Sequence, residues 1–185
     1  ALPVCVYRKI HDLAIHSTSL PQDIIIAWIQ VLAFFYCMRS CEYSDVVGER
    51  RTKTVCFRNI RFHKNNKEIP HHSPTIFHAT SVSITFEWQK RDVRDDTITH
   101  QRSNDKVGKK IMCPVRACAE LVTTIYKSKI SPDKIPNMKI NTAISKGKVF
   151  TIPSSMVLDR IRTAVRFLGK EKLGFTEADV GTHSN

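Results

Sequence analysis

Four segments of the chain have the spacing of apolar residues that a helix requires. Residues 24–38 are apolar almost throughout, which predicts a helix buried on all sides, and Pro21 lies where a first helical turn accepts a proline. Residues 4–15 have the amphipathic pattern of a first helix, and residues 114–126 and about 154–168 have an apolar stripe at helical spacing. The run at 24–38 has about fifteen residues, whereas a bilayer span needs roughly twenty, so we expect a buried helix and no membrane segment.

Alternating apolar residues predict strands in the middle of the chain. Residues 82–88 carry an apolar side chain at every second position, and after an Asp-rich turn residues 97–100 form a short return run, which is typical of a hairpin. Residues 54–62 also alternate and predict a strand, whereas residues 128–148 are rich in Lys, Pro and Asn and indicate an exposed loop. The sequence therefore predicts a mainly helical α+β fold with a small antiparallel sheet, formed by residues 1–185 as one domain.

The charge of the chain favours a polyanionic partner. It has 29 basic and 17 acidic residues and a net charge of +12, which makes nucleic acid the first partner to consider. Many of the basic residues gather in one short stretch, where they would follow phosphates along a strand and its loops: Arg50, Arg51, Lys53, Arg58, Arg61, Lys64 and Lys67. A solvated face that only keeps the protein in solution has the same composition, so both interpretations stay open.

The six cysteines include no CxxC pair. We therefore expect reduced thiols in an intracellular protein. A zinc site built from Cys113, Cys118 and a histidine would lack the spacing of the common structural zinc sites, so no metal is expected. The first residues, Ala-Leu-Pro, do not resemble a secretory signal, and the absence of an initiator Met indicates a segment of a longer protein.

Two short motifs far apart in the chain resemble the active-site boxes of a known family. Residues 34–43, Phe-Phe-Tyr-Cys-Met-Arg-Ser-Cys-Glu-Tyr, resemble the first box of the tyrosine recombinase (phage integrase) catalytic domain, in which a buried helix ends in Arg-x-x-Glu. His183-Ser184-Asn185 resembles the start of its His-x-x-Arg box. With Cys-Pro-Val-Arg at residues 113–116, the chain is similar to the recombinases of Crypton-type eukaryotic mobile elements. The resemblance implies the DNA breaking-rejoining catalytic core of that family.

The resemblance assigns Arg39 to the scissile phosphate. An arginine suits that position because its planar guanidinium donates two parallel hydrogen bonds and keeps its charge while negative charge develops on the non-bridging oxygens. Glu42, one helical turn further on, would position the site rather than act as an acid or base. A structural alternative stays open, in which Arg39 caps the buried helix and pairs with Glu42 or Asp45.

Lys90 matches the hairpin lysine that protonates the leaving 5′ oxygen in this family. A mobile ammonium at a hairpin tip can reach the DNA backbone beside the cut, which suits a general acid. Arg91 and Arg94 lie in the same turn, and any of the three could be only a phosphate contact. His183 matches the histidine that contacts the scissile phosphate and assists proton movement, although an isolated histidine at this place would be interpreted as an exposed side chain.

Two catalytic residues of the family have no counterpart in the chain. The second arginine would directly follow Asn185, and all four tyrosines precede His183, so none takes the role of the nucleophile. We therefore expect a partial catalytic domain and leave open whether it acts as an enzyme. The full-length protein would cut and rejoin DNA through a 3′-phosphotyrosyl intermediate, which conserves the energy of the broken bond and needs no cofactor.

The expected partner is double-stranded DNA. By resemblance to the family, the protein would form a homo-oligomer on DNA and reside in the nucleus or elsewhere inside the cell. One alternative is a DNA-binding relic or domesticated mobile-element protein without catalysis. Another is an unrelated RNA-binding domain, which the absence of interleaved aromatic residues disfavours.

Overall fold

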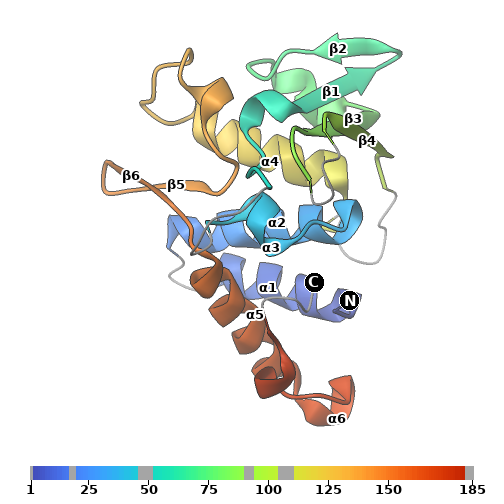
Figure 1. Cartoon of the computed structure of the whole chain (residues 1–185), viewed down its shortest axis with the longest axis vertical. Helices are drawn as coiled ribbons and strands as arrows, with labels where there is room; N and C mark the ends of the chain where they lie inside the picture. Colours follow the sequence, from blue (N-terminus) through green and yellow to red (C-terminus); the bar gives the residue numbers. More distant parts are fainter. Residues whose placement is uncertain (1, 17–19, 46–51, 90–93, 104–110, 182–185) are drawn as a thin grey trace. The chain divides into compact units, whose positions relative to one another are not determined.

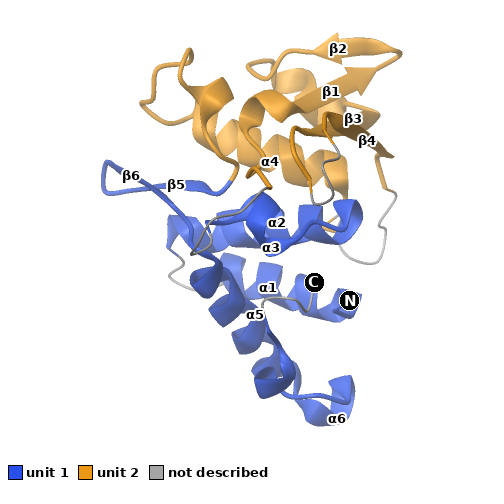
Figure 2. Cartoon of the chain, viewed as in Figure 1, with its two compact units in different colours: residues 1–47, 141–185 blue, residues 48–140 orange. Residues whose placement is uncertain are grey.

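The computed structural model describes residues 2–16, 20–45, 52–89, 94–103 and 111–181 (Figure 1). The chain divides into two compact units, one formed by residues 1–47 and 141–185 and the other by residues 48–140 (Figure 2). Within the described residues lie six α-helices, a four-stranded antiparallel sheet and a two-stranded one. The fold is therefore α+β with a small antiparallel sheet.

The first unit is built around α2 (Pro21–Tyr36), of whose 16 residues ten are buried. A helix that is apolar all round is excluded from water on every side, as the sequence predicted. α1 (Val4–His16) and α5 (Ser154–Leu168) pack against α2 and against each other. The remaining elements of this unit are the short helices α3 (Ser40–Tyr43) and α6 (Lys170–Leu173), the 3-10 helix η4 (Glu177–Asp179), and the hairpin of β5 (Thr142–Ser145) and β6 (Lys148–Thr151).

A tight turn follows α2 and sets the position of Arg39. Cys37 has a φ of +50° and ends the helix in the left-handed conformation, with its backbone N–H donating to the carbonyl of Ala33. The N–H of Met38 donates to the same carbonyl at 3.1 Å, and the Met38 side chain is buried. Arg39 has an extended backbone and is the N-cap residue of α3. The arginine therefore lies just beyond the core helix, at the start of a separate helical turn.

The second unit contains a four-stranded sheet with α4 (Pro114–Tyr126) packed against two of its strands. Joining β1 and β2, Asn65 and Asn66 both have positive φ, as a two-residue hairpin turn requires. All neighbouring strands are antiparallel, and Ile60 of β1 lies opposite Ile84 of β3. The strand order is β2 (Lys67–Ile69), β1 (Ile60–Lys64), β3 (Ser81–Phe86), β4 (Asp96–Gln101).

The four helices and the main hairpin predicted from hydrophobic spacing are confirmed. The helices expected at 4–15, 114–126 and 154–168 are α1, α4 and α5, and the hairpin expected from 82–88 and 97–100 is the pair β3 and β4. The helix expected at 24–38 is α2, which ends two residues earlier, at Tyr36.

The strand predicted at 54–62 is wrong in its first part. Residues 57–59 form the 3-10 helix η1 (Phe57–Asn59), and β1 begins only at Ile60. Two contacts fix the turn: the N–H of Cys56 donates to the side-chain oxygen of Asn59 at 2.7 Å, and the N–H of Phe57 donates to the carbonyl of Met138 at 2.9 Å. At residues 57–59 a side-chain cap and a tertiary contact therefore take the place of the hydrogen bonds between strands that the alternating pattern predicted.

The exposed loop predicted at 128–148 is also wrong in part. It contains the 3-10 helix η3 (Ile135–Asn137) and the strand β5, which pairs with β6. Ile135, Ile140 and Ala143 are fully buried. Lys146 and Gly147 both have positive φ and form a two-residue turn between the strands. These few buried apolar residues order a segment whose composition is otherwise that of a loop.

All six cysteines are free thiols, as expected. Cys41, Cys113 and Cys118 are buried, whereas Cys37 is exposed. Burial raises the pKa of the Cys118 thiol, which keeps it protonated. Among the described helices, none combines the length and the hydropathy that crossing a bilayer requires.

Candidate nucleic-acid interface

Arg39 presents its guanidinium to solvent while its backbone is fixed by Glu42. The N–H of Arg39 donates to Oε2 of Glu42 at 2.8 Å, and the N–H of Glu42 donates back to the carbonyl of Arg39 at 2.9 Å. The Glu42 side chain is only 5% exposed, whereas that of Arg39 is 55% exposed. The closest approach between the two charged groups is 3.9 Å, from Nη1 to Oε1. This ion pair is loose, so N–H groups on the edges of the exposed guanidinium can donate to an anion.

Glu42 is a buried carboxyl group whose ionisation depends on Arg39. Burial raises the pKa of Glu42, and the hydrogen bond from the Arg39 N–H and the charge of its guanidinium only partly oppose that shift. The contacts are those of the structural alternative: Glu42 holds the turn in place, and Arg39 is the N-cap residue of α3 and lies near the Glu42 carboxylate. The role of Arg39 at a phosphate stays a prediction. The geometry matches a positioning role for Glu42, since its oxygens face the turn.

The segment that leads to His183 lies beside α3. Gly181 lines a small hollow of the first unit together with Ser40, the residue after Arg39, and with residues of α3 and α5. Val180 is buried, and its carbonyl accepts hydrogen bonds from Nε and Nη2 of Arg162 at 3.1 and 3.0 Å. His183 itself lies outside the described residues. Ser40 and Gly181, which are 141 positions apart in sequence, therefore line the same hollow, and the assembly of Arg39 and His183 into one site stays a prediction.

The residues predicted at the tip of the β3–β4 hairpin are described only in part. Lys90 and Arg91 lie outside the described residues. Arg94 stacks on the Trp88 ring, with its guanidinium carbon 4.6 Å from the ring centroid. A guanidinium held in this way keeps its hydrogen-bonding edges available while its face is covered by the ring.

In the basic stretch of the second unit, some of the described side chains contact the carboxylate of Glu87. Arg61 is exposed on β1, opposite Ser83 of β3. Nε of Arg58 donates to Oε1 of Glu87 at 2.8 Å, and Nη2 lies 2.8 Å from the same oxygen in an ion pair. Lys53 lies 3.7 Å from Oε2 of the same carboxylate and has a largely exposed side chain. Arg50 and Arg51 lie outside the described residues.

Sequence reasoning missed Glu87 as the partner of the basic residues. Its carboxylate also accepts from Nδ2 of Asn59 at 2.9 Å. Because Ile60 pairs with Ile84 across β1 and β3, residues that precede β1 lie beside residues that follow β3, which is how Arg58 meets Glu87. The contact could have been predicted only from the pairing of β1 with β3. The alternation at 54–62 placed the start of β1 too early, so the sequence did not show that Arg58 precedes the strand.

Arg39 and Glu87 belong to different units. Arg39 and Glu42 lie in the unit of residues 1–47 and 141–185, and the basic stretch lies in the unit of residues 48–140. Each unit therefore offers its own candidate contact for an anion. Arg102, a basic residue that follows the hairpin, donates to the carbonyls of Phe77 and Ala79 and serves the fold of its own unit.

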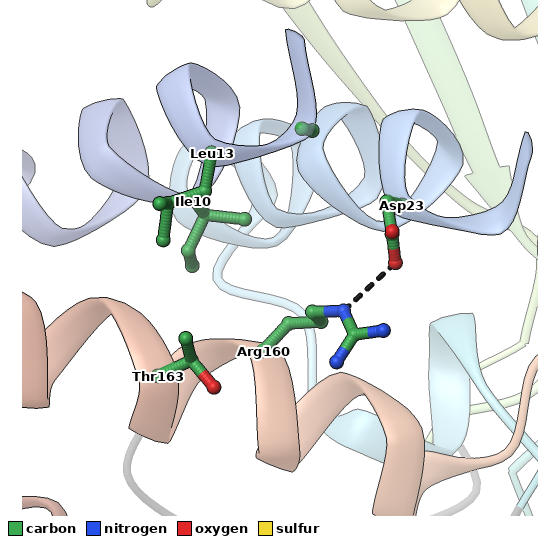
Figure 3. A pocket seen from close by; sticks show the side chains of 6 residues that line it. Ile10, Leu13, Asp23, Arg160 and Thr163 are labelled. Atoms are coloured by element: carbon green, nitrogen blue, oxygen red, sulfur yellow. Dashed lines mark hydrogen bonds and ion pairs between the residues drawn. The ribbon is translucent and has the colours of Figure 1, made fainter. Parts of the chain in front are cut away.

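A cavity of about 260 Å³ opens between α1, α2 and α5 in the first unit. Figure 3 shows Arg160 directed toward Asp23, and Nε donates to Oδ1 at 2.7 Å. Arg160 also donates to Asp159. Since the cation in this wall is already paired with two carboxylates, the cavity lacks the free positive charge that a phosphate requires. Its lining consists of Ile10, Leu13, Ala14, Asp23, Arg160 and Thr163.

The tyrosines of the chain are built into its two units. Tyr7, Tyr36 and Tyr43 are at most 5% exposed, and burial raises the pKa of Tyr7. Tyr126 is half-buried and contacts the ring of His71 edge to face. A nucleophile must reach the phosphorus atom and lose its proton, and burial opposes both.

Among the described residues, no group of three or more His, Cys, Asp or Glu side chains is arranged to hold a metal ion. Comparisons with protein families, with characterised proteins and with solved structures find no match to this chain. The resemblance to tyrosine recombinases therefore stays a prediction from the motifs around Arg39 and His183.

Proposed function

We propose that this chain binds duplex DNA and supplies the phosphate-holding arginine of a strand-cleaving site of the tyrosine-recombinase type. The observation that carries the proposal is the arrangement around Arg39. Its backbone is fixed by a buried carboxylate, its guanidinium is exposed, and the segment leading to His183 lies beside the same helical turn.

The chemistry of phosphoryl transfer explains why this arrangement is useful. When a phosphodiester is attacked, negative charge grows on its non-bridging oxygens, and donors that are already in place stabilise that charge without reorganisation. Glu42 keeps the Arg39 backbone in place, so the side chain needs to order only its own rotamers. In the proposal, His183 is a second donor to the same phosphate, and Lys90 is the general acid for the leaving 5′ oxygen.

The charge of the chain supports DNA as the substrate. The exposed Arg61 and Lys53 of the second unit are suited to backbone phosphates, as is the net charge of +12. Contacts of this kind position the protein and do not read sequence, so affinity should depend steeply on salt and weakly on base composition. The proposal includes assembly of several copies on DNA and residence in the nucleus, both from the family resemblance.

Fluorescence anisotropy with a labelled duplex tests the binding part. We expect affinity to fall steeply between about 50 and 200 mM salt, and Arg39→Ala to leave most of it in place because one phosphate contact is lost among several. Arg166→Ala is the matched control, since Arg166 is a similarly exposed arginine of the same unit that pairs with Glu177. Tighter binding to RNA of the same sequence would contradict the proposal.

A nicked duplex that traps covalent protein–DNA adducts tests the catalytic part. The 185-residue chain alone should give no adduct, because its tyrosines are buried or half-buried. A version extended by the downstream coding sequence should give one, and Arg39→Ala in that version should abolish it while Arg166→Ala does not. If the extended version binds duplex DNA but never forms an adduct, the second candidate, a DNA-binding protein without catalysis, is the correct one.

A further inference from the structure

Glu87 collects donors from several segments of the second unit. Its Oε1 accepts from Nε of Arg58 and from Nδ2 of Asn59 and lies 2.8 Å from Nη2 of Arg58, and its Oε2 lies 3.7 Å from the ammonium of Lys53. Arg58 also donates from Nη1 to the side-chain oxygen of Asn137 in η3. We call these five residues, Lys53, Arg58, Asn59, Glu87 and Asn137, the Glu87 cluster.

The contacts of Arg58 leave two N–H groups of its guanidinium without a partner in the cluster. A guanidinium has five N–H groups, one on Nε and two on each Nη. Glu87 lies at the edge formed by Nε and Nη2, and Asn137 takes one N–H of Nη1. One N–H on each Nη is left, and that of Nη2 lies on the end-on edge, from which a guanidinium can donate to a phosphate. The Arg58 side chain is 42% exposed.

The cluster is rigid and carries a net positive charge. The buried Asn59 donates a hydrogen bond to the carboxylate of Glu87, which is therefore held by Asn59 as well as by Arg58. The hydrogen bond from Asn59 lowers the pKa of Glu87 most, followed by the contacts with Arg58, which keeps Glu87 ionised at neutral pH. Lys53 and Arg58 carry two positive charges against one negative charge, and the Lys53 side chain is 61% exposed.

We propose that the Glu87 cluster binds one backbone phosphate of duplex DNA, end-on to Arg58 and with Lys53 as the second cation, and that Glu87 is the positioning residue. This inference rests on the proposed function, since it names one contact of the DNA surface. Glu87 has two opposing effects. Its oxygens hold Arg58 in the orientation that a phosphate needs, while its charge repels that phosphate.

Two substitutions of Glu87 separate these effects. Glu87→Gln retains Oε1 as the acceptor for Arg58 and Asn59, turns the amide nitrogen toward the largely exposed Lys53 side chain, and removes the negative charge. Glu87→Ala removes the charge and the acceptor together, so Arg58 loses its fixed orientation. We expect E87Q to bind duplex DNA about threefold or more tighter than the parent at low salt, since a like charge within one Debye length is gone. E87A should bind more weakly than E87Q although both have the same charge.

Arg58 provides the second comparison. Arg58→Lys keeps the charge but not the planar fork, and Arg58→Gln removes both. R58Q should lower the slope of log affinity against log salt by about 0.9, the value for one lost phosphate contact. R58K should retain most of the slope and still lose affinity, because a lysine lacks the planar guanidinium whose N–H groups Glu87 and Asn137 hold in a fixed orientation. Thermal unfolding of each variant shows whether it is folded at the temperature of the binding assay.

The results distinguish a failure of this inference from a failure of the proposed function. Equal affinity of E87Q and E87A would show that positioning is irrelevant, and weaker binding of E87Q than of the parent would show that the charge of Glu87 does not oppose the ligand; either overturns the inference. Retention on a heparin column provides the second measurement. If the parent fails to bind duplex DNA, the proposed function fails. A later elution of E87Q than of E87A from heparin would then still support an anion site at Arg58, and identical elution would overturn it.

Discussion

Gln30 is a polar residue in the most apolar helix of the protein, and replacing it should stabilise the fold. Its side chain is 0% exposed, and neither Oε1 nor Nε2 has a hydrogen-bond partner in the described part of the chain. An amide buried without partners costs about 1–3 kcal/mol in mutational data on proteins. Gln30→Met keeps the length of the side chain and removes both polar atoms. We therefore expect Q30M to raise the free energy of unfolding of the first unit by about 1–3 kcal/mol.

Urea unfolding followed by tryptophan fluorescence measures this effect. The chain has two tryptophans, Trp28 in the first unit and Trp88 in the second. In a Trp88→Phe background, the buried Trp28 on α2 is the only reporter and follows the unit that contains Gln30. Ile29→Met is the matched control, because it also introduces a methionine at a fully buried position of α2 without removing a polar group. It should cost less than about 1.5 kcal/mol.

A result in the opposite direction would refute the reasoning. If Q30M is less stable than its parent while I29M behaves as expected, the amide of Gln30 must have a partner in solution, such as a bound water or a second molecule. An unchanged midpoint with a smaller dependence of the free energy on urea would instead indicate that the unfolded state had changed.

Further predictions concern one residue each. Glu42→Gln retains the acceptor for the N–H of Arg39, so in urea unfolding it should be at least about 1 kcal/mol more stable than Glu42→Ala. Because burial raises the pKa of Glu42, the parent should lose stability relative to E42Q as the pH rises through that pKa. Burial lowers the pKa of His71 below its unfolded value of about 6.5, so the unfolded state binds the proton more readily and the second unit should lose stability as the pH falls below about 6.5; a pH-independent unfolding midpoint between about pH 7 and 5 would contradict this. Lys146 has a φ of +49° before Gly147 in the turn between β5 and β6, and Lys146→Asn should raise the thermal midpoint through about 0.5–1 kcal/mol of relieved strain, because Asn-Gly favours this turn.

The sequence could predict single residues and local motifs of the candidate site, but not the contacts between distant segments. The sequence indicated Arg39 next to Glu42, and the short turn that joins them follows from their spacing. It also indicated basic residues around Arg58, but not which of them would be engaged. Glu87 lies 29 residues from Arg58 in the chain, and only the pairing of β1 with β3 brings them within hydrogen-bonding distance.

Local pattern determined the helices and the main hairpin of this protein. Residues 114–126 and 154–168 carry an apolar stripe at helical spacing, and one buried face is enough to specify a helix wherever it packs. The alternation at 82–88 likewise identified Val82, Ile84 and Phe86 as core residues of β3, although Ser81 and Ser83 on its other face are buried as well. These features depend on neighbours in the sequence, so the sequence by itself determined them.

Contacts between distant segments decided the rest. Phe57 donates its N–H to Met138, which turns an alternating segment into a 3-10 helix. Ile135 and Ile140 are buried in a stretch whose lysines and prolines indicate a loop. In each case one or two long-range contacts outweigh a weak local preference, because burying an apolar side chain or pairing a buried backbone group contributes more free energy than the local propensity at stake. Only the tertiary structure could decide these elements, and with them the orientation of Arg58.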